Sequence, residues 1–495
     1  MKAFKYLSLI VLALSLNACT DFAKLEQNPN KATSVPPSLV LRGIQTDLFQ
    51  DAWSDVHRYN QFWLSNYNYY DNNEYNWTSA DLRFTTLKNI QKMEEEALAR
   101  DAAAVNPYAA LGKFYRALAY YEMTSLVGDL PLSEALKGAE NVAPAYDTQE
   151  EIFAQILTWL EEANSELATL ITAADVSLSG DIYFSNDLRA WQRTVNTFKL
   201  RVLIALSKHD DNATLGIKAK FADVINNPAK YPLMTSRDEN MQFVYNTNVN
   251  LYPFNPSNFG FVATRDNTSA TLLGILTSLE DPRTFVVAEP ASYYADTLGY
   301  GAADFRSYVG APAAEGLDDM AFKVLKGRYS LFNKNYWSSF TGTPTAQVGY
   351  EEMCFNIAEA ANRGWVTADA ASWYGKGITA AMNAFGINSA ADIAAYIAKP
   401  AVAYKGGTDG LNQILSQKYV AFFNNSGWEA YFNWRRTGVP TFDVGSGTGA
   451  NGKIPVRFQY PLAERSINKT NYDAAVQRQF DGNDDINAKM WLIKD

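Results

Sequence analysis

Apolar side chains recur every three or four residues along much of the chain, which is the spacing of one face of an α-helix. Between Tyr108 and Leu126 the apolar positions follow this spacing, and Gly128 and Pro131 come shortly after them. Glycine and proline commonly end helices. The same spacing predicts further helices over Ile152 to Leu170, Leu188 to Leu206, Gly349 to Ala361, Ala370 to Phe385, Ser389 to Ala398 and Leu411 to Phe423.

Polar residues stand where the second and third of these helices begin. Asp147 or Thr148 can cap one helix, and Asn186 or Asp187 can cap the next. Alternating, strand-like patterns are scarce and reach no further than residues 240–245. Small residues in the paired helices, at Ala109, Ala110, Ala117 and Ala119, favour close helix contacts. We therefore expect a fold dominated by α-helices, with tetratricopeptide-like helix pairs forming a scaffold, although no strict 34-residue repeat is present.

Three long segments interrupt the helical pattern, at residues 226–268, 280–317 and 328–346. Their Pro, Gly, Asn and aromatic content is typical of ordered, irregular structure. In compact proteins, long ordered loops on a rigid scaffold commonly carry the function. We expect this loop-rich region to hold any ligand site.

The first nineteen residues have the features of a secretory signal. Lys2 and Lys5 precede a short apolar run from Tyr6 to Leu16, which is too short to span a bilayer. Cys19 follows small and polar residues, as in a bacterial lipoprotein signal, where the cysteine becomes the lipidated first residue. The alternative is an ordinary signal peptide with a chance cysteine. We predict a signal peptide over residues 1–18, a single domain over 19–495, and membrane attachment through lipid on Cys19.

Composition excludes several classes of function. The 495 residues carry a net charge of -10 without a run of Lys or Arg, which argues against a nucleic-acid partner. The only histidines are His57 and His209, and no motif of a zinc protease, serine hydrolase or nucleotide-binding loop is present. We expect neither a cofactor nor a metal ion. Cys354 lies in an apolar helical pattern and is expected to be a buried, inert thiol.

The segment QKYVAFFNNSGWEAYFNWRRTGVP, at residues 417–440, resembles a hallmark of the SusD/RagB family of outer-membrane nutrient-binding lipoproteins. Other stretches resemble the family in the same order along nearly the whole mature chain. They lie at residues 114–132, 191–207, 279–284, 351–365, 454–468 and around Trp491.

This resemblance implies a protein that pairs with a SusC-like TonB-dependent transporter and lies over its barrel at the cell surface. Such proteins bind a glycan, or sometimes another nutrient, and deliver it for import; they are not enzymes. The implied fold is one α-helical domain with tetratricopeptide-like helix pairs. The motif residues Glu429, Arg435 and Arg436 are expected to form buried ion pairs or to bind helix carbonyls, and Glu359 and Arg363 to pair on one helix face.

The resemblance implies a ligand site on aromatic rings beside amides and carboxylates, because sugar rings stack their C–H faces on aromatic side chains. Aromatic residues make up 14% of the chain. The first candidate group is Tyr70, Asn72, Asn73, Tyr75 and Trp77, and the second comprises Tyr336 and Trp337, with Tyr293 at the rim. The alternative is that these rings anchor loops to the scaffold.

Two other functions stay open. A helical-repeat scaffold that binds only proteins would use the aromatic loops as its interface. A secreted glycoside hydrolase or lyase would need two carboxylates about 5–10 Å apart across a cleft. Glu351 and Glu352 are such acids, but they lie on a helix whose periodic face indicates packing.

Overall fold

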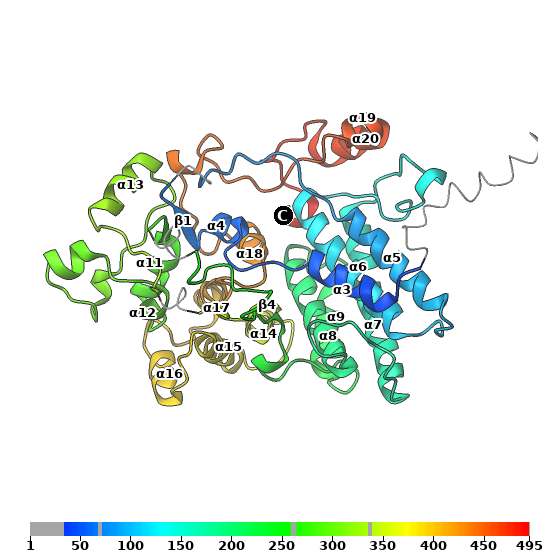
Figure 1. Cartoon of the computed structure of the whole chain (residues 1–495), viewed down its shortest axis with the longest axis horizontal. Coiled ribbons are helices and arrows are strands. Elements are labelled where there is room, and N and C mark those ends of the chain that lie inside the picture. The colour runs from blue at the N-terminus through cyan, green and yellow to red at the C-terminus, as the bar shows by residue number, and fades with distance from the viewer. Residues whose placement is uncertain (1–33, 68–71, 259–263, 335–338, 495) are drawn as a thin grey trace, which may run out of the picture.

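The computed structural model describes residues 34–67, 72–258, 264–334 and 339–494. Helices dominate these ranges and form two main groups, on the two sides of Figure 1. The first group comprises α3 (Pro37–Asp47), α5 (Phe84–Leu98), α6 (Pro107–Val127), α7 (Gln149–Thr172), α8 (Leu188–Ala205) and α9 (Ile217–Asn226). The second comprises α14 (Tyr350–Asn362), α15 (Ala370–Ala384), α16 (Ala390–Ile397), α17 (Gly407–Ala421) and α18 (Glu429–Thr437).

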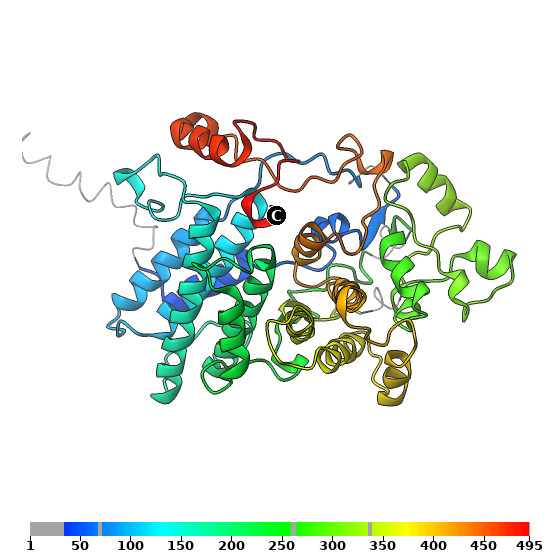
Figure 2. The same ribbon diagram turned by 180° about the vertical axis from the view of Figure 1, so that it is seen from behind.

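Shorter elements surround these groups. α4 (Asp55–Tyr59), α11 (Ala270–Ser278), α12 (Thr284–Val287) and α13 (Leu317–Leu325) lie in or beside the loop-rich region, and α19 (Glu464–Ile467) and α20 (Lys469–Phe480) lie at one edge of the molecule. Figure 2 shows the same arrangement from behind. No helix in the described ranges is long and apolar enough to cross a membrane.

The predicted helix starts are confirmed. The Thr148 hydroxyl accepts a hydrogen bond from the backbone N–H of Glu151, and the Glu151 carboxylate accepts one from the backbone N–H of Thr148 at 2.8 Å. This reciprocal pair is a capping box, which satisfies two donors that an α-helix leaves without intrahelical partners. The Asp187 carboxylate caps α8 by accepting from the backbone N–H of Arg189 at 2.8 Å.

Adjacent helices pair as the small residues predict. α6 packs against α7, α7 against α8, and α14 against α15. Ala110, Ala117 and Ala119 of α6 are fully buried. In α15, a Cβ atom on Gly377 would lie only 2.7 Å from the Phe355 ring of α14. The predicted fold, an α-helical scaffold of tetratricopeptide-like pairs, is confirmed.

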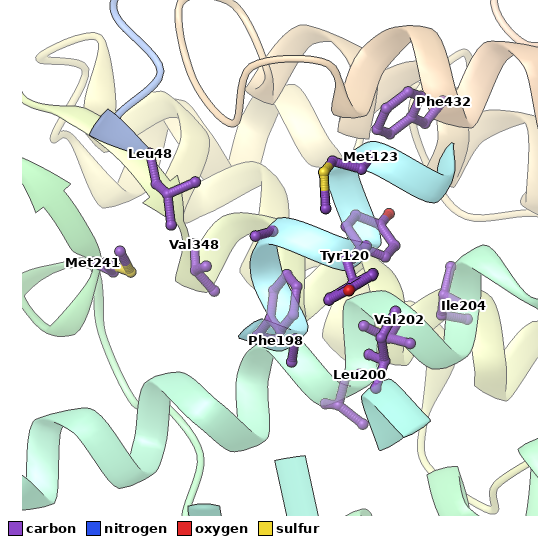
Figure 3. Close-up of a cluster of buried hydrophobic side chains, with 14 of the residues drawn as sticks. Leu48, Tyr120, Met123, Phe198, Leu200, Val202, Ile204, Met241, Val348 and Phe432 are labelled. Atoms are coloured by element: carbon purple, nitrogen blue, oxygen red, sulfur yellow. The ribbon is translucent and has the colours of Figure 1, made fainter. Parts of the chain in front are cut away.

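The hydrophobic core joins the two helical groups. Figure 3 shows Tyr120 and Met123 of α6, Phe198 of α8 and Phe432 of α18 in one buried cluster. Leu48, Met241 and Val348 reach the same cluster from segments far apart in the sequence. Because these side chains are buried against one another, the cluster fixes the loop-rich segments to the helices.

In the described part of the chain, four short strands form two antiparallel pairs. β2 (Met241–Phe243) pairs with β4 (Thr345–Val348), which confirms the strand expected near residues 240–245. β1 (Trp63–Ser65) pairs with β3 (Asp266–Thr268), and Leu64 lies opposite Asn267. The second pair lies in the part of the fold that carries α4, α11 and α13.

Candidate ligand-binding face

Three chain segments leave or enter the small sheet of β1 and β3 side by side, at one end of that sheet. β3 is antiparallel to β1, and Asn267 of β3 also forms an antiparallel bridge with Leu331. The chain leaving β1, the chain entering β3 and the chain leaving Leu331 therefore emerge at the same end of this small sheet. We call this end, formed by Asn66, Tyr67, Thr264, Arg265 and Asn333, the strand-end face.

An exposed tyrosine braced by an arginine is the main feature of the strand-end face. The side chain of Tyr67 is 42% exposed, and the Arg265 guanidinium carbon lies 4.3 Å from the centre of its ring. An arginine stacked on a ring limits the motion of that ring and presents several N–H donors around its edge. A rigid ring beside fixed donors is suited to a sugar, which offers C–H faces and hydroxyl groups.

Backbone and amide hydrogen bonds hold the two strand ends together. The Asn66 backbone N–H donates to the Arg265 carbonyl at 2.8 Å, and the Asn66 side-chain amide donates to the Thr264 carbonyl at 3.1 Å. The Asn333 amide donates to the Phe285 carbonyl at 2.9 Å. These contacts fix the positions of Tyr67 and Arg265 in the folded protein, so the face is formed before any ligand arrives.

Tyr75 and Trp77 from the first predicted group lie in the core. They are 1% and 7% exposed. The Trp77 ring stacks on Phe458 with centroids 4.2 Å apart, and the Tyr75 hydroxyl donates to the Tyr59 carbonyl at 2.8 Å. Burial raises the pKa of Tyr75 well above its usual value. With their faces covered by protein, these rings anchor the loop in this structure, as the alternative interpretation stated.

The two asparagines of the first group differ in exposure. Asn73 is buried, and its amide exchanges hydrogen bonds with the backbone of Ser65, at 2.9 Å to the N–H and 2.8 Å to the carbonyl. Asn72 is exposed, and its side-chain oxygen accepts from the backbone N–H of Glu74 at 2.9 Å. Asn73 thus joins this loop to the end of β1, which leads into the strand-end face.

Tyr293 lies outside the strand-end face, in a π-helical turn at Tyr293–Thr297. Its ring is partly exposed, and the Arg328 guanidinium carbon lies 4.2 Å from the ring centre. The other predicted residues, Tyr70, Tyr336 and Trp337, lie outside the described residues, as do Cys19 and the signal segment 1–18. Their roles stay predictions.

Tyr67 was not among the predicted site residues, and neither was Arg265. It belongs to no motif, and its pairing with Tyr67 joins two parts of the chain that are distant in the sequence. The only sequence signal was its place in the long loop-rich segment that ends at Thr268.

The hallmark arginines are structural, as predicted. Both terminal nitrogens of Arg436 bind the Glu359 carboxylate, at 2.5 and 2.9 Å, and Arg363 binds it at 2.9 Å from the same helix as Glu359. Arg435 donates to the Val456 carbonyl at 2.7 Å. Burial alone would raise the pKa of Glu359, but Arg436, Lys418 and Arg363 lower it to about 2. These contacts tie α18 to α14 and to the C-terminal segment.

The pKa of Glu429, at the start of α18, is shifted in the opposite direction to the pKa of Glu359. Burial raises the pKa of Glu429 to about 7, against the attraction of Arg201. Arg201 is already engaged with the Glu352 carboxylate, at 2.8 Å from its Nε, and with the Gln347 carbonyl at 2.7 Å. Glu429 therefore receives less compensation than Glu359 and keeps its proton to higher pH.

The titratable groups that an enzyme could use are either buried or engaged in structural contacts. His57 is fully buried, and burial lowers its pKa to about 3. His209 stacks on Trp491 with centroids 3.9 Å apart and contacts the Trp491 carbonyl at 2.8 Å. Glu351 binds Arg237, and Glu352 binds Arg201. Among the described residues, no three His, Cys, Asp or Glu side chains gather as a metal site would require.

Known proteins share this fold and are similar to the chain in sequence. The SusD-like family model described as "Starch-binding associating with outer membrane" matches residues 29–461. A SusD homologue of Bacteroides fragilis is 30% identical, with a TM-score of 0.84, covering 93% of this chain and 100% of its own. A second from that organism is 32% identical, with a TM-score of 0.81 and the same coverage. A chitin-binding SusD homologue of Flavobacterium johnsoniae shares the fold at 20% identity and a TM-score of 0.69, covering 93% and 95%.

These matches place the chain in a family of binding proteins associated with the bacterial outer membrane. No curated protein is a significant match to it. The family model covers most of the chain, and two solved SusD homologues reach 30% identity or more over nearly its whole length. The protein belongs to the SusD-like family, as the sequence motifs predicted.

Proposed function

We propose that this protein captures an oligo- or polysaccharide at the outer membrane and delivers it to a SusC-like TonB-dependent transporter. It acts by binding and not by catalysis. The observation that carries this proposal is the braced, exposed ring of Tyr67 beside Arg265 at the strand-end face. Family membership supports the nutrient-binding role, and the family description names starch.

The arrangement suits capture and release better than permanent retention. The ring of Tyr67 offers a stacking surface, and the Arg265 guanidinium beside it offers hydrogen-bond donors for hydroxyl groups. A single stacked ring is a weak contact, since even a pair of aromatic side chains contributes only about 0.5–1.5 kcal/mol beyond the area it buries. Such a contribution holds a long glycan through several weak contacts, from which a transporter can remove it.

We further propose that the protein is held at the membrane by lipid on Cys19, with its bulk facing the cell exterior. The lipid anchor follows from the signal-like residues 1–18 and the cysteine that comes after them, and the outward orientation follows from the family resemblance. Replacing Cys19 with alanine should release the protein from the membrane fraction in cells. Retention of the Cys19→Ala protein in that fraction would show that another feature anchors it.

The test of glycan capture is retardation in native gels that contain starch, chitin-derived or other polysaccharides. Residues 20–495 should be slowed by at least one polysaccharide, and Tyr67→Ala should weaken the retardation. The matched control is Tyr300→Ala, because Tyr300 is also exposed and carries an arginine, Arg306, 4.2 Å from its ring centre. An equal loss of retardation in both variants, or no loss of retardation in Tyr67→Ala, would contradict the assignment of the strand-end face as the ligand site.

A lid that binds only protein is the second candidate function. On α13, Phe322 is 60% exposed and Leu325 is 84% exposed, and exposed apolar side chains of this size favour protein contacts. This candidate predicts co-purification with a TonB-dependent barrel together with no retardation by any glycan. Co-purification with retardation would favour the first proposal.

A further inference from the structure

A cleft apart from the strand-end face lies between α15 and the start of α14. Its volume is about 620 Å³, within the range of roughly 300–1,000 Å³ typical of small-molecule sites. One wall is the short segment 235–238, and the far end reaches Asn388 and Ile397 beside α16. In both Figures 1 and 2, α15 and α16 lie towards the lower edge, whereas β1 lies in the upper half.

The wall opposite α15 is held in place by the start of α14. Arg237 pairs with the Glu351 carboxylate, which also accepts from the Asn240 amide at 3.0 Å. The Asn240 side-chain oxygen in turn accepts from the backbone N–H of Tyr350 at 2.7 Å. The cleft is thus formed by residues that the fold already orders, so ligand binding would cost little free energy for ordering them.

The floor is one face of α15, where Gly375, Thr379 and Asn383 follow one another at intervals of four residues. Two glycines of this helix differ in their surroundings. A Cβ atom on Gly377 would meet the Phe355 ring at 2.7 Å, whereas one on Gly375 would meet only Ile397 Cδ1, at 4.0 Å. Helix packing therefore requires Gly377 to lack a side chain but places no such demand on Gly375, whose missing side chain leaves the cleft wider.

The lining is suited to a neutral ligand rich in hydroxyl groups. Asn383 and Asn388 supply amides, and Tyr350, Ala380 and Ile397 supply apolar surface. Charge is balanced, because Arg237 is paired with Glu351, and the cleft carries one further cation, Lys376, and one anion, Asp238. A free anion or cation would find no excess of opposite charge there.

We propose that this cleft, the α15 cleft, is a second saccharide-binding site, separate from the strand-end face. The inference rests on the proposed function, because it assigns the same class of ligand. A polysaccharide long enough to reach both sites would bind with an affinity greater than either site provides alone. Short oligosaccharides would occupy the sites independently.

The test is the number of oligosaccharide molecules bound per protein, measured by equilibrium dialysis with maltohexaose and, separately, chitohexaose. For at least one probe we expect two molecules on the unaltered protein. One should remain in Asn383→Trp, which fills the α15 cleft, and one in Tyr67→Ala. Ser372→Trp is the matched control, because Ser372 is exposed on α15 outside the cleft, and it should bind two. Asn383→Ala, which adds no bulk, should weaken the same site.

The possible outcomes separate the two proposals. One molecule that depends on Tyr67 and not on Asn383 would overturn the α15 cleft and leave the proposed function standing. One molecule that depends on Asn383 and not on Tyr67 would support the α15 cleft and contradict the strand-end face. No binding of either probe would overturn the α15 cleft as a site for these saccharides, and retardation by another glycan in native gels would then still uphold the proposed function.

Discussion

Two arginines of this protein, Arg436 and Arg265, have opposite roles. Arg436 is buried at the end of α18, where it binds Glu359 and donates to the Ser207 hydroxyl at 2.7 Å. Arg265 lies at the strand-end face against the exposed ring of Tyr67. The first belongs to the motif that marks the family, and the second belongs to no motif.

The difference shows why family membership is easier to establish than ligand identity. A buried ion pair needs both partners and fixed geometry, since loss of one partner leaves an uncompensated charge in the core. A stacking ring on an open face can be exchanged for another ring or moved along a loop without loss of the fold. The family motif therefore marks residues that hold the scaffold, such as Arg436, and does not locate the ligand contacts.

The largest expected effect is on the free energy of unfolding, and it distinguishes buried aromatic residues from exposed ones. Trp77→Ala should lower the free energy of unfolding by about 3–5 kcal/mol, because it removes a buried ring that packs on Phe458. Tyr67→Ala, at an exposed position, should lower it by no more than about 1 kcal/mol, the size of the contact with Arg265 that it removes. Urea unfolding of both variants measures these values. A Trp77→Ala protein of unaltered stability that fails to bind glycan would reverse the assignment of the two rings.

The second prediction concerns the two buried glutamates and pH. The folded-state pKa of Glu429 is raised to about 7, so its contribution to stability is full below the unfolded value of 4.5 and is lost as pH rises through 7. Glu359, with its pKa lowered to about 2, contributes above pH 4.5 and loses that contribution as pH falls towards 2.

Replacing Glu429 with glutamine should therefore flatten the stability profile between about pH 4.5 and 7. The variant should exceed the unaltered protein at pH 8, by up to about 3 kcal/mol for a shift of this size. Glu359→Gln, the matched control, should be less stable at pH 8. Thermal unfolding across this pH range measures both, and an unaltered slope in Glu429→Gln would show that another group causes it.

The smallest expected effect compares the two glycines of α15. Gly375→Ala should raise the free energy of unfolding by roughly 0.5–1 kcal/mol, because alanine favours helices and the new methyl group meets no close neighbour. Gly377→Ala should lower it, since its Cβ would clash with Phe355. Denaturant unfolding distinguishes the two. A loss of stability in Gly375→Ala would show that packing, and not the cleft, requires glycine there.

The sequence by itself determined the helical scaffold and the family. The spacing of apolar residues and the capping of helix ends are local properties. The starts of α7 and α8 at Thr148 and Asp187 could therefore be predicted from a few neighbouring residues. Several other helices of the described ranges were not predicted, among them α3, α5, α9, α11, α13 and α20. The roles of Arg436 and Glu359 also followed from the sequence, because the motif places them at a helix end and on a helix face.

Only the tertiary structure decided which aromatic rings are free to meet a ligand. Trp77 and Tyr67 look alike in the sequence, both being in one aromatic stretch rich in asparagine. Trp77 is covered because Phe458, from the far end of the chain, stacks on it, and Tyr67 is braced because β3 brings Arg265 beside it. Burial depends on such contacts between distant segments, and no local pattern of residues specifies them.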